Sequence, residues 1–290
     1  MEMGYVQNRF AGGLASTKSQ LITVIVPALS SRVFAEVVHA ASEVFSPRGY
    51  QILVSNTSYS LEDEEEACRR VLSWRPDGII VSGVDHSVAT RQMLKDAGVP
   101  VVEALEIGAD PIDINVGISH VEAGRCAGRY LVGLGRRKIG IIGAQMEADF
   151  RASRRLAGFR DELAKAGQTP VALSLREEPS TFEVGALGLS ELMATHRELD
   201  AIFGVNDELA VGALLEAQRR GIKVPDQLAI MGFNDLDISS QINPSLTTIR
   251  SQRRRMGQVA AQAILDRLDG KKGPTGPVDL GVELMKRESA

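Results

Sequence analysis

The stretch LITVIVPAL at residues 21–29 has the composition of a buried strand, and a run of helical character at 33–47 follows it. The pattern then repeats, with YQILVSNT at 50–57 and a second helical run that opens at Ser60. Strand-length apolar runs that alternate with amphipathic helix-length runs are typical of βαβ units, which build a parallel sheet. The strand runs are rich in Val and Ile, as expected of strands covered by helices on both faces.

The alternation continues along the chain and restarts once. The first series adds strands at 77–83, 99–105 and 114–119 and helices at 86–97 and 121–134. The second series has strands at 138–144, 171–175, 200–206 and 228–234 and helices at 151–166, 183–195 and 207–220. One more long helix at 252–269 and a last strand at 278–284 follow it. We therefore predict an α/β fold of two similar doubly wound parallel-sheet lobes, joined by strands that cross near 115–120 and 245–251.

The predicted domains follow from this division. Residues 1–20 are a hinge or linker remnant, 21–135 plus 251–270 form the N-terminal lobe, and 136–250 plus 271–290 form the C-terminal lobe. Ligands of open parallel sheets sit beyond the carboxyl ends of the strands, so two facing lobes predict a binding cleft between them.

Composition excludes several classes of protein. The net charge of -4 argues against a large nucleic-acid surface, which needs a basic face. Cys68 and Cys126 lack metal-ligand spacing and are expected to be small buried thiols of a reducing compartment. The N-terminal residues contain no apolar leader, and no apolar run approaches the length of a membrane span. We therefore expect a soluble, cytoplasmic protein with no membrane partner.

Catalytic motifs are absent from the sequence. It contains no phosphate-binding GK[ST] loop, no GxGxxG after a strand, no GxSxG elbow and no HExxH. The four histidines are scattered and are expected to lie at the surface or at helix caps: His39, His86, His120 and His196. We therefore predict no enzymatic activity, no cofactor and no metal site.

Polar residues gather where the predicted strands end. Ser30 and Ser31 follow the first strand with Phe34 close behind, Ser82 ends the third, and Asn206 and Asn234 end GVN and GFN.

The helix after KIGIIGA opens with three arginines, Arg151, Arg154 and Arg155. Positive charge at a helix start opposes the helix dipole, so these arginines predict an anionic partner. The alternative is solvated charge that pairs with Asp149 or Asp161.

Four motifs occur in register and resemble the LacI/GalR family of bacterial repressors. They are RRLAGF (154–159), GVNDELAVGAL (204–214), GIKVPDQLAIMGFND (221–235) and PSLTTIR (244–250). The segment GYVQNRFAGGLAS (4–16) is similar to the family's hinge between its recognition domain and its effector-binding core. The resemblance covers essentially the whole chain and implies a periplasmic-binding-protein type I-like core.

The resemblance also implies roles for single residues. Effector contacts map onto Ser31, Phe34, Arg155, Asn206 and Asn234, with Phe182 and Ser251 as weaker candidates. The DNA-contacting hinge maps onto Asn8, Arg9, Ala11 and Leu14, with Leu14 as a wedge between base steps.

Two departures from the family pattern matter. The usual GFD is GFN here, so Asn234 replaces an acid, which suits an anionic ligand whose carboxylate Arg151 or Arg155 would hold. GFNDLD, PSLTTIR and the late VDLG resemble the gluconate-repressor branch of the family, and this resemblance implies a sugar acid of the gluconate kind. The family's helix-turn-helix head does not precede Met1, so we expect operator binding to require that missing head, and the hinge to be disordered without DNA.

The sequence thus predicts the effector-binding and dimerisation core of a LacI-type repressor, in which a ligand reorients the lobes of a homodimer and so changes operator affinity. Helix 33–47 is a candidate dimer surface, although ordinary lobe core explains it equally well. The alternatives are a periplasmic-type sugar-binding protein and, more distantly, an enzyme acting on sugar acids.

Overall fold

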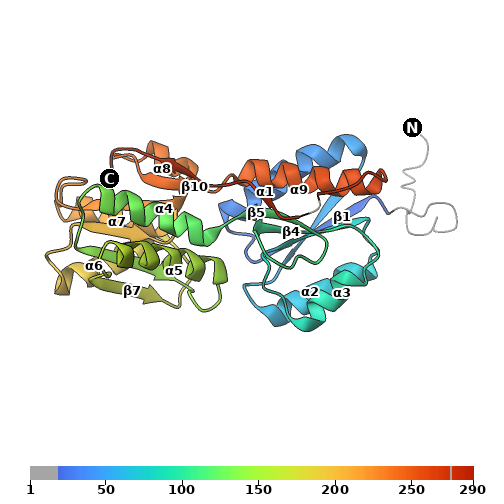
Figure 1. The fold of residues 1–290 in the computed structure, drawn as a ribbon, viewed down its shortest axis with the longest axis horizontal. Coiled ribbons are helices and arrows are strands. Elements are labelled where there is room, and N and C mark those ends of the chain that lie inside the picture. Colours follow the sequence, from blue (N-terminus) through green and yellow to red (C-terminus); the bar gives the residue numbers. More distant parts are fainter. Residues whose placement is uncertain (1–18, 275) are drawn as a thin grey trace, which may run out of the picture. The chain divides into compact units, whose positions relative to one another are not determined.

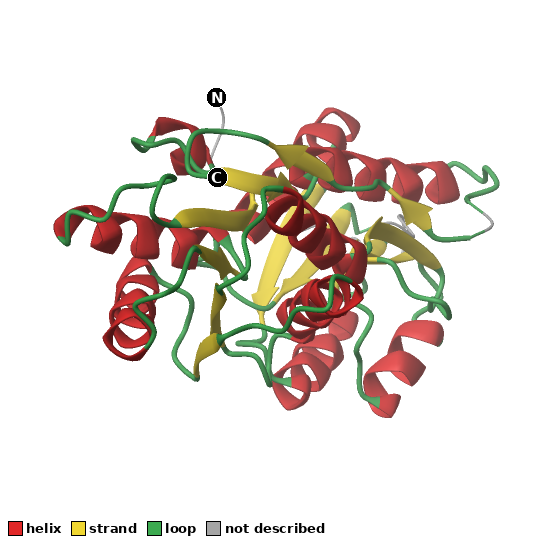
Figure 2. Ribbon diagram, turned by 60° about the vertical axis from the view of Figure 1, so that its left-hand side comes forward, coloured by secondary structure: helices red, strands yellow, loops and turns green. Residues whose placement is uncertain are grey.

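The computed structural model describes residues 19–274 and 276–290, which form two compact units. The first comprises residues 19–117 with Arg253–Val278, and the second Ile118–Gln252 with Asp279–Ala290. Each contains a sheet of six strands within the described residues, flanked by helices (Figures 1 and 2). The hinge residues Asn8, Arg9, Ala11 and Leu14 lie outside the described residues.

The first sheet has the strand order β11-β5-β4-β3-β1-β2. Its strands are β1 (Leu21–Val26), β2 (Gln51–Asn56), β3 (Gly78–Ser82), β4 (Val101–Glu106), β5 (Ile114–Ile118) and β11 (Val278–Asp279). Its helices are α1 (Arg32–Phe45), the short η1 (Ser46–Arg48), α2 (Leu61–Ser73), α3 (Val88–Lys95) and α9 (Arg253–Leu268). β1 pairs in parallel with β2 and β3, as expected of βαβ units. Helices α1 and α9 lie on one face of this sheet, and α2 and α3 lie on the other (Figure 1).

The second sheet repeats the arrangement with the order β12-β10-β9-β8-β6-β7. Its strands are β6 (Ile139–Ala144), β7 (Ala172–Arg176), β8 (Ala201–Gly204), β9 (Ala229–Asn234), β10 (Thr247–Arg250) and β12 (Glu283–Met285). Its helices are α4 (His120–Gly133), α5 (Phe150–Lys165), α6 (Phe182–Thr195), α7 (Asp207–Arg219) and α8 (Asp237–Gln241). β6 to β10 pair in parallel, whereas β12 runs antiparallel to β10.

Two unit boundaries and one strand differ from the sequence prediction. Helix α4 packs against α5 in the second unit, so the first change of unit lies between Gly117 and Ile118 instead of at 135. The last change of unit lies between Val278 and Asp279 instead of at 270. The single strand predicted at 278–284 is wrong: β11 and β12 are two short strands in different sheets, and Gly281 between them has a φ of 67°.

Local sequence signals account for helix α2. The Ser60 hydroxyl accepts a hydrogen bond from the Asp63 backbone at 3.1 Å, which satisfies an amide that the helix leaves unpaired. Arg69 forms ion pairs with Glu65 and Glu66 one turn before it, both at 2.8 Å. Three acids of this helix, Glu62, Asp63 and Glu66, are exposed, whereas Glu64 is buried.

Glycine allows α4 and α5 to pack at backbone distance. A Cβ on Gly124 would overlap the carbonyl oxygen of Arg155, and a Cβ on Gly158 would overlap the carbonyl oxygen of Val121. The two glycines therefore form a reciprocal contact between the helices. Such a contact tolerates no side chain, because the atoms it would meet belong to backbone and cannot rotate away.

The first unit buries a charged cluster. The imidazole of His86 is fully buried, with Nδ1 2.7 Å from the Glu64 carboxylate and Nε2 3.6 Å from that of Glu103. The partly exposed guanidinium of Arg91 lies 3.8 Å from the buried Glu103 carboxylate. Burial alone lowers the pKa of His86, but the carboxylates of Glu103 and Glu64 outweigh it and raise the pKa to about 9. The predicted surface or capping role is therefore wrong for His86, since partners from other elements enclose it.

We predict that Gly124→Ala lowers the free energy of unfolding by about 1–3 kcal/mol, because the new methyl group forces α4 away from α5. Gly133→Ala, on the same helix with no atom within 4 Å of its Cβ position, is the matched control and changes stability by less than about 1 kcal/mol. Urea denaturation of both variants measures the difference, and equal stabilities would contradict the reciprocal packing.

We predict a pH-dependent stability for the first unit. Because the pKa of His86 is raised in the folded chain, its stabilising contribution is complete below about pH 6.5 and is lost as pH rises through about 9. Between pH 6.5 and 8.5 the loss amounts to about 2 kcal/mol. NMR titration of the His86 ring is the direct measurement, and a midpoint at or below 6.5 would show that the carboxylates do not hold the proton.

Candidate functional site

The carboxyl ends of four parallel strands meet at one edge of the second sheet. In the register of the sheet, Ile142 lies beside Gly204 and Arg250 lies beside Asn234. The residues that follow these strands therefore gather at this edge. Three residues predicted from the sequence to contact a ligand are among them: Asn206, Asn234 and Ser251.

Arg155 comes to the same edge from helix α5, with only 4% of its surface exposed. Its Nε donates to the carbonyl oxygen of Val205 at 3.0 Å, and its guanidinium carbon lies 4.2 Å from the ring centre of Phe233. Its Nη1 lies 2.9 Å from Nδ1 of His120. A cation over an aromatic face and against a carbonyl is held in a fixed orientation.

Asn234 ends β9 in an unusual backbone conformation. Its φ is 121° and that of Asp235 is 58°, both in the region that favours glycine. The Ser251 hydroxyl lies 3.3 Å from Oδ1 of Asn234, and both residues are buried. Strain of this kind clusters at functional sites and needs support from its surroundings.

Asp235 provides that support. Its carboxylate accepts hydrogen bonds from Nε of Arg250 at 2.8 Å and from the guanidinium of Arg287 at 2.6 Å. The carboxylate of Asp235 thus binds two arginines of the second unit and holds the end of β9, where Asn234 lies, in place.

Asn206 acts as the N-cap of α7. Its Oδ1 accepts from the Leu209 backbone at 3.1 Å, and its amide nitrogen donates to the Ser180 hydroxyl at 2.7 Å. Both ends of this amide are therefore already engaged within the second unit.

The next residue, Asp207, is fully buried. Its carboxylate accepts from the Leu236 backbone at 2.7 Å, from Ser239 at 2.8 Å and from Thr248 at 2.6 Å. Burial raises the pKa of Asp207, and the three hydrogen bonds oppose that rise.

Arg151 and Phe182, which the sequence also predicts to contact the ligand, have other neighbours. Nε of Arg151 is 3.5 Å from Asp149, which also caps α5 through the Ala152 amide at 3.2 Å, so the local pairing left open by the sequence occurs for Arg151.

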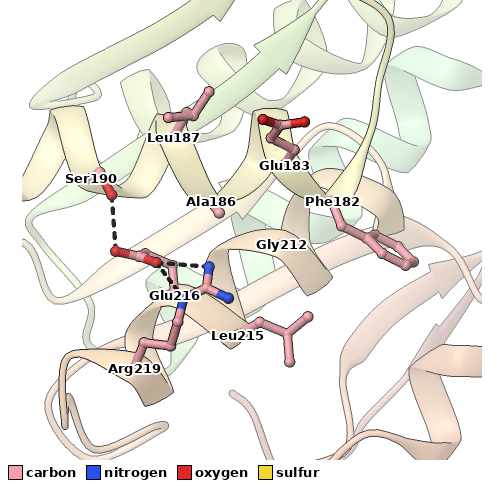
Figure 3. A pocket seen from close by; sticks show the side chains of 9 residues that line it. All are labelled: Phe182, Glu183, Ala186, Leu187, Ser190, Gly212, Leu215, Glu216 and Arg219. Atoms are coloured by element: carbon pink, nitrogen blue, oxygen red, sulfur yellow. Dashed lines mark hydrogen bonds and ion pairs between the residues drawn. The ribbon is translucent and has the colours of Figure 1, made fainter.

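Phe182 is 44% exposed at the start of α6 and lines a surface pocket of about 360 Å³ with Leu187, Leu215 and Arg219 (Figure 3). In the same pocket, Arg220 and Arg219 lower the pKa of Glu216 to about 2 by hydrogen bonding to it.

The first unit holds the remaining predicted residues. Ser30 and Ser31 precede α1, and Phe34 within α1 is buried, with its ring 6.4 Å from that of Tyr59. The Ser82 hydroxyl donates to the carbonyl oxygen of Ile25 at 3.0 Å. These residues lie at or after the carboxyl ends of β1 and β3.

His120 and Phe233 are the residues that sequence reasoning missed. His120 is buried, with its ring 5.6 Å from that of Phe233, and Phe233 supports Arg155. The expected surface or capping role is wrong for His120. The adjacency of Phe233 to Asn234 was a usable signal, whereas nothing in the sequence links His120 to Arg155 35 residues later.

The described residues contain no group of three or more His, Cys, Asp or Glu side chains that could hold a metal ion. Cys68 is buried and has no disulfide partner, and burial raises the pKa of its thiol to about 12. None of the helices in residues 19–274 and 276–290 combines the length and apolar character needed to cross a membrane.

Comparison with known proteins identifies the family. Residues 129–290 match the family described as periplasmic binding protein-like domain. The chain is 39% identical over 289 residues to the HTH-type transcriptional regulator GntR of Pseudomonas aeruginosa, an alignment that covers 99% of this chain and 84% of that protein.

Solved structures agree with this assignment. A LacI-family transcriptional regulator from Silicibacter pomeroyi is similar with a TM-score of 0.94 and 35% identity, over 99% of this chain and 86% of that one. The lac repressor dimer bound to operator and the anti-inducer ONPF is similar with a TM-score of 0.84 and 26% identity, over 99% of both chains. These relatives regulate transcription and are not enzymes. The chain belongs to the LacI family of transcriptional regulators.

Proposed function

We propose that this regulator senses a sugar acid of the gluconate kind, which it binds at the carboxyl edge of the second sheet. The ligand would meet Arg155 through its carboxylate and the amide of Asn234 through its hydroxyl groups. Binding would change the affinity of a homodimer for operator DNA. The proposal rests on the family and on the chemistry of these two side chains.

The buried guanidinium of Arg155 is the observation that carries the proposal. A carbonyl, a ring and an imidazole hold it in place, so its planar fork of donors is oriented before a ligand arrives. Such a fork matches the two oxygens of a carboxylate, and little further ordering is needed on binding. Of the two arginines predicted for this task, Arg155 is preferred because Arg151 pairs with Asp149.

Asn234 supports an anionic polyol over a neutral sugar. An amide both donates and accepts, so it can bond hydroxyl groups without adding negative charge. The family resemblance places an acid at this position, and a carboxylate there would repel an anionic ligand. Ser251, 3.3 Å from Asn234, is a further hydroxyl at the same place.

The other predicted contacts remain part of the proposal. Asn206 would offer its amide only by sharing its present partners, Leu209 and Ser180. Five further contacts are proposed from the sequence and the resemblance alone: Ser30, Ser31, Phe34 and Ser82 of the first unit, and Phe182 on α6.

Regulation requires that the ligand distinguish two states of the protein. A ligand with equal affinity for the operator-binding and released states would leave their populations unchanged. Because the related lac repressor is a dimer bound to operator, we propose that this chain also acts as a dimer. The transcriptional regulators among its relatives do not favour the periplasmic-type sugar-binding alternative.

A thermal-shift titration tests the proposal. Gluconate should raise the unfolding temperature in a concentration-dependent way, because a ligand that binds the folded state stabilises it by mass action. Glucose, a neutral aldose of similar size, serves as the matched ligand. Stabilisation by glucose without any by sugar acids would refute the sugar-acid assignment.

We predict that Asn234→Asp weakens gluconate binding by about tenfold or more, because it places a carboxylate beside the ligand's own charge. Gln241→Glu adds the same charge on the exposed surface of α8 and should leave the affinity within about twofold. Isothermal titration calorimetry measures both variants. Equal affinities for gluconate in Asn234→Asp and the parent chain would remove Asn234 from the site.

A further inference from the structure

The neighbour of Arg155 on helix α4 is His120, a residue with no assigned role. Both side chains are buried, and Nη1 of Arg155 lies 2.9 Å from Nδ1 of His120. The pair joins the first residue of α4 to the second turn of α5, whose backbones touch at the reciprocal glycines Gly124 and Gly158.

Donor and acceptor roles in this pair follow from chemistry. A guanidinium has only donors, so Nδ1 of His120 must accept the hydrogen bond. The imidazole is then neutral and carries its proton on Nε2. A neutral imidazole can therefore accept a hydrogen bond from the buried guanidinium without adding a charge of its own.

His120 also contacts the surface on which Arg155 rests. Its ring meets that of Phe233 at 62° with 5.6 Å between centres, an edge-to-face arrangement. Phe233 in turn lies 4.2 Å beneath the guanidinium and directly precedes Asn234. One imidazole therefore fixes both the guanidinium and the ring that supports it.

We propose that His120 is a positioning residue for the effector: its neutral imidazole orients the Arg155 guanidinium toward an anionic ligand. This inference rests on the proposed function of Arg155. His120 acts through Arg155, so its contribution disappears when Arg155 is absent. The requirement is for an acceptor at the position of Nδ1, which the amide oxygen of an asparagine can supply.

Calorimetry with gluconate as the probe tests the binding part. His120→Leu removes the acceptor and should weaken gluconate binding by about tenfold or more, whereas His120→Asn restores an acceptor and should recover most of that loss. His196→Leu is the matched control, because His196 faces Glu198 at the end of α6 and should leave the affinity unchanged.

A double-mutant cycle separates positioning from general damage. In an Arg155→Gln background, His120→Leu should cause no further loss of gluconate affinity, because the group it orients is gone. A loss in the double variant equal to the sum of the two single losses would overturn the proposal, as would a His120→Leu protein that binds gluconate like the parent chain.

NMR of the arginine side chain tests the proposal without any ligand. In the parent chain and in His120→Asn, the Arg155 guanidinium should show resolved, slowly exchanging N–H signals, and in His120→Leu these should broaden or average. Unchanged Arg155 signals in His120→Leu would overturn the positioning role. If the parent chain fails to bind gluconate, the proposed ligand is wrong, and the NMR comparison still decides the role of His120.

Discussion

The Asp207 carboxylate holds together the edge of the second sheet on which the candidate site depends. It accepts hydrogen bonds from the turn after β9, from α8 and from β10, while its own backbone begins α7. A buried carboxylate is tolerated only when donors surround it, and here three do. Gly232 on β9 makes room for it, since a Cβ there would overlap Oδ1 of Asp207. Four segments of the chain are therefore fixed relative to one another by a single carboxyl group.

The same edge uses buried charges of both signs, with different consequences. Asp207 and Asp235 meet donors from the scaffold, which commits their carboxylates to holding strands and turns together. Arg155 contacts a carbonyl, an aromatic ring and an imidazole, and these contacts orient its guanidinium. The two acids therefore have a structural role, and the orientation of the arginine is what the proposed recognition of an anion uses.

Much of the fold followed from local sequence, and much of the site did not. The alternation of apolar and amphipathic runs predicted the βα units, and the helical run predicted to open at Ser60 is α2 with Ser60 as its N-cap, because these features depend on near neighbours. The short strands β11 and β12 were predicted as one strand, since two or three residues of extended pattern cannot show which sheet they join. His86 and His120 were misplaced at the surface because their partners come from other elements of the fold. Motif resemblance located Arg155, yet only the structure showed what holds it.

The strained end of β9 connects the site to the last residues of the chain. Backbone strain such as that at Asn234 costs on the order of 1–3 kcal/mol and persists only where the surroundings determine it. Asp235 supplies this constraint through Arg250 and Arg287, and the C-terminal segment that carries Arg287 is itself fastened to the sheet. Ser289 donates to the carbonyl oxygen of Ile230 at 2.6 Å and accepts from the Thr247 backbone at 2.9 Å. Because the segment lies across β9 and β10, it stabilises the conformation that presents the amide of Asn234, and the geometry of the candidate site is thereby set partly by residues far from it in sequence.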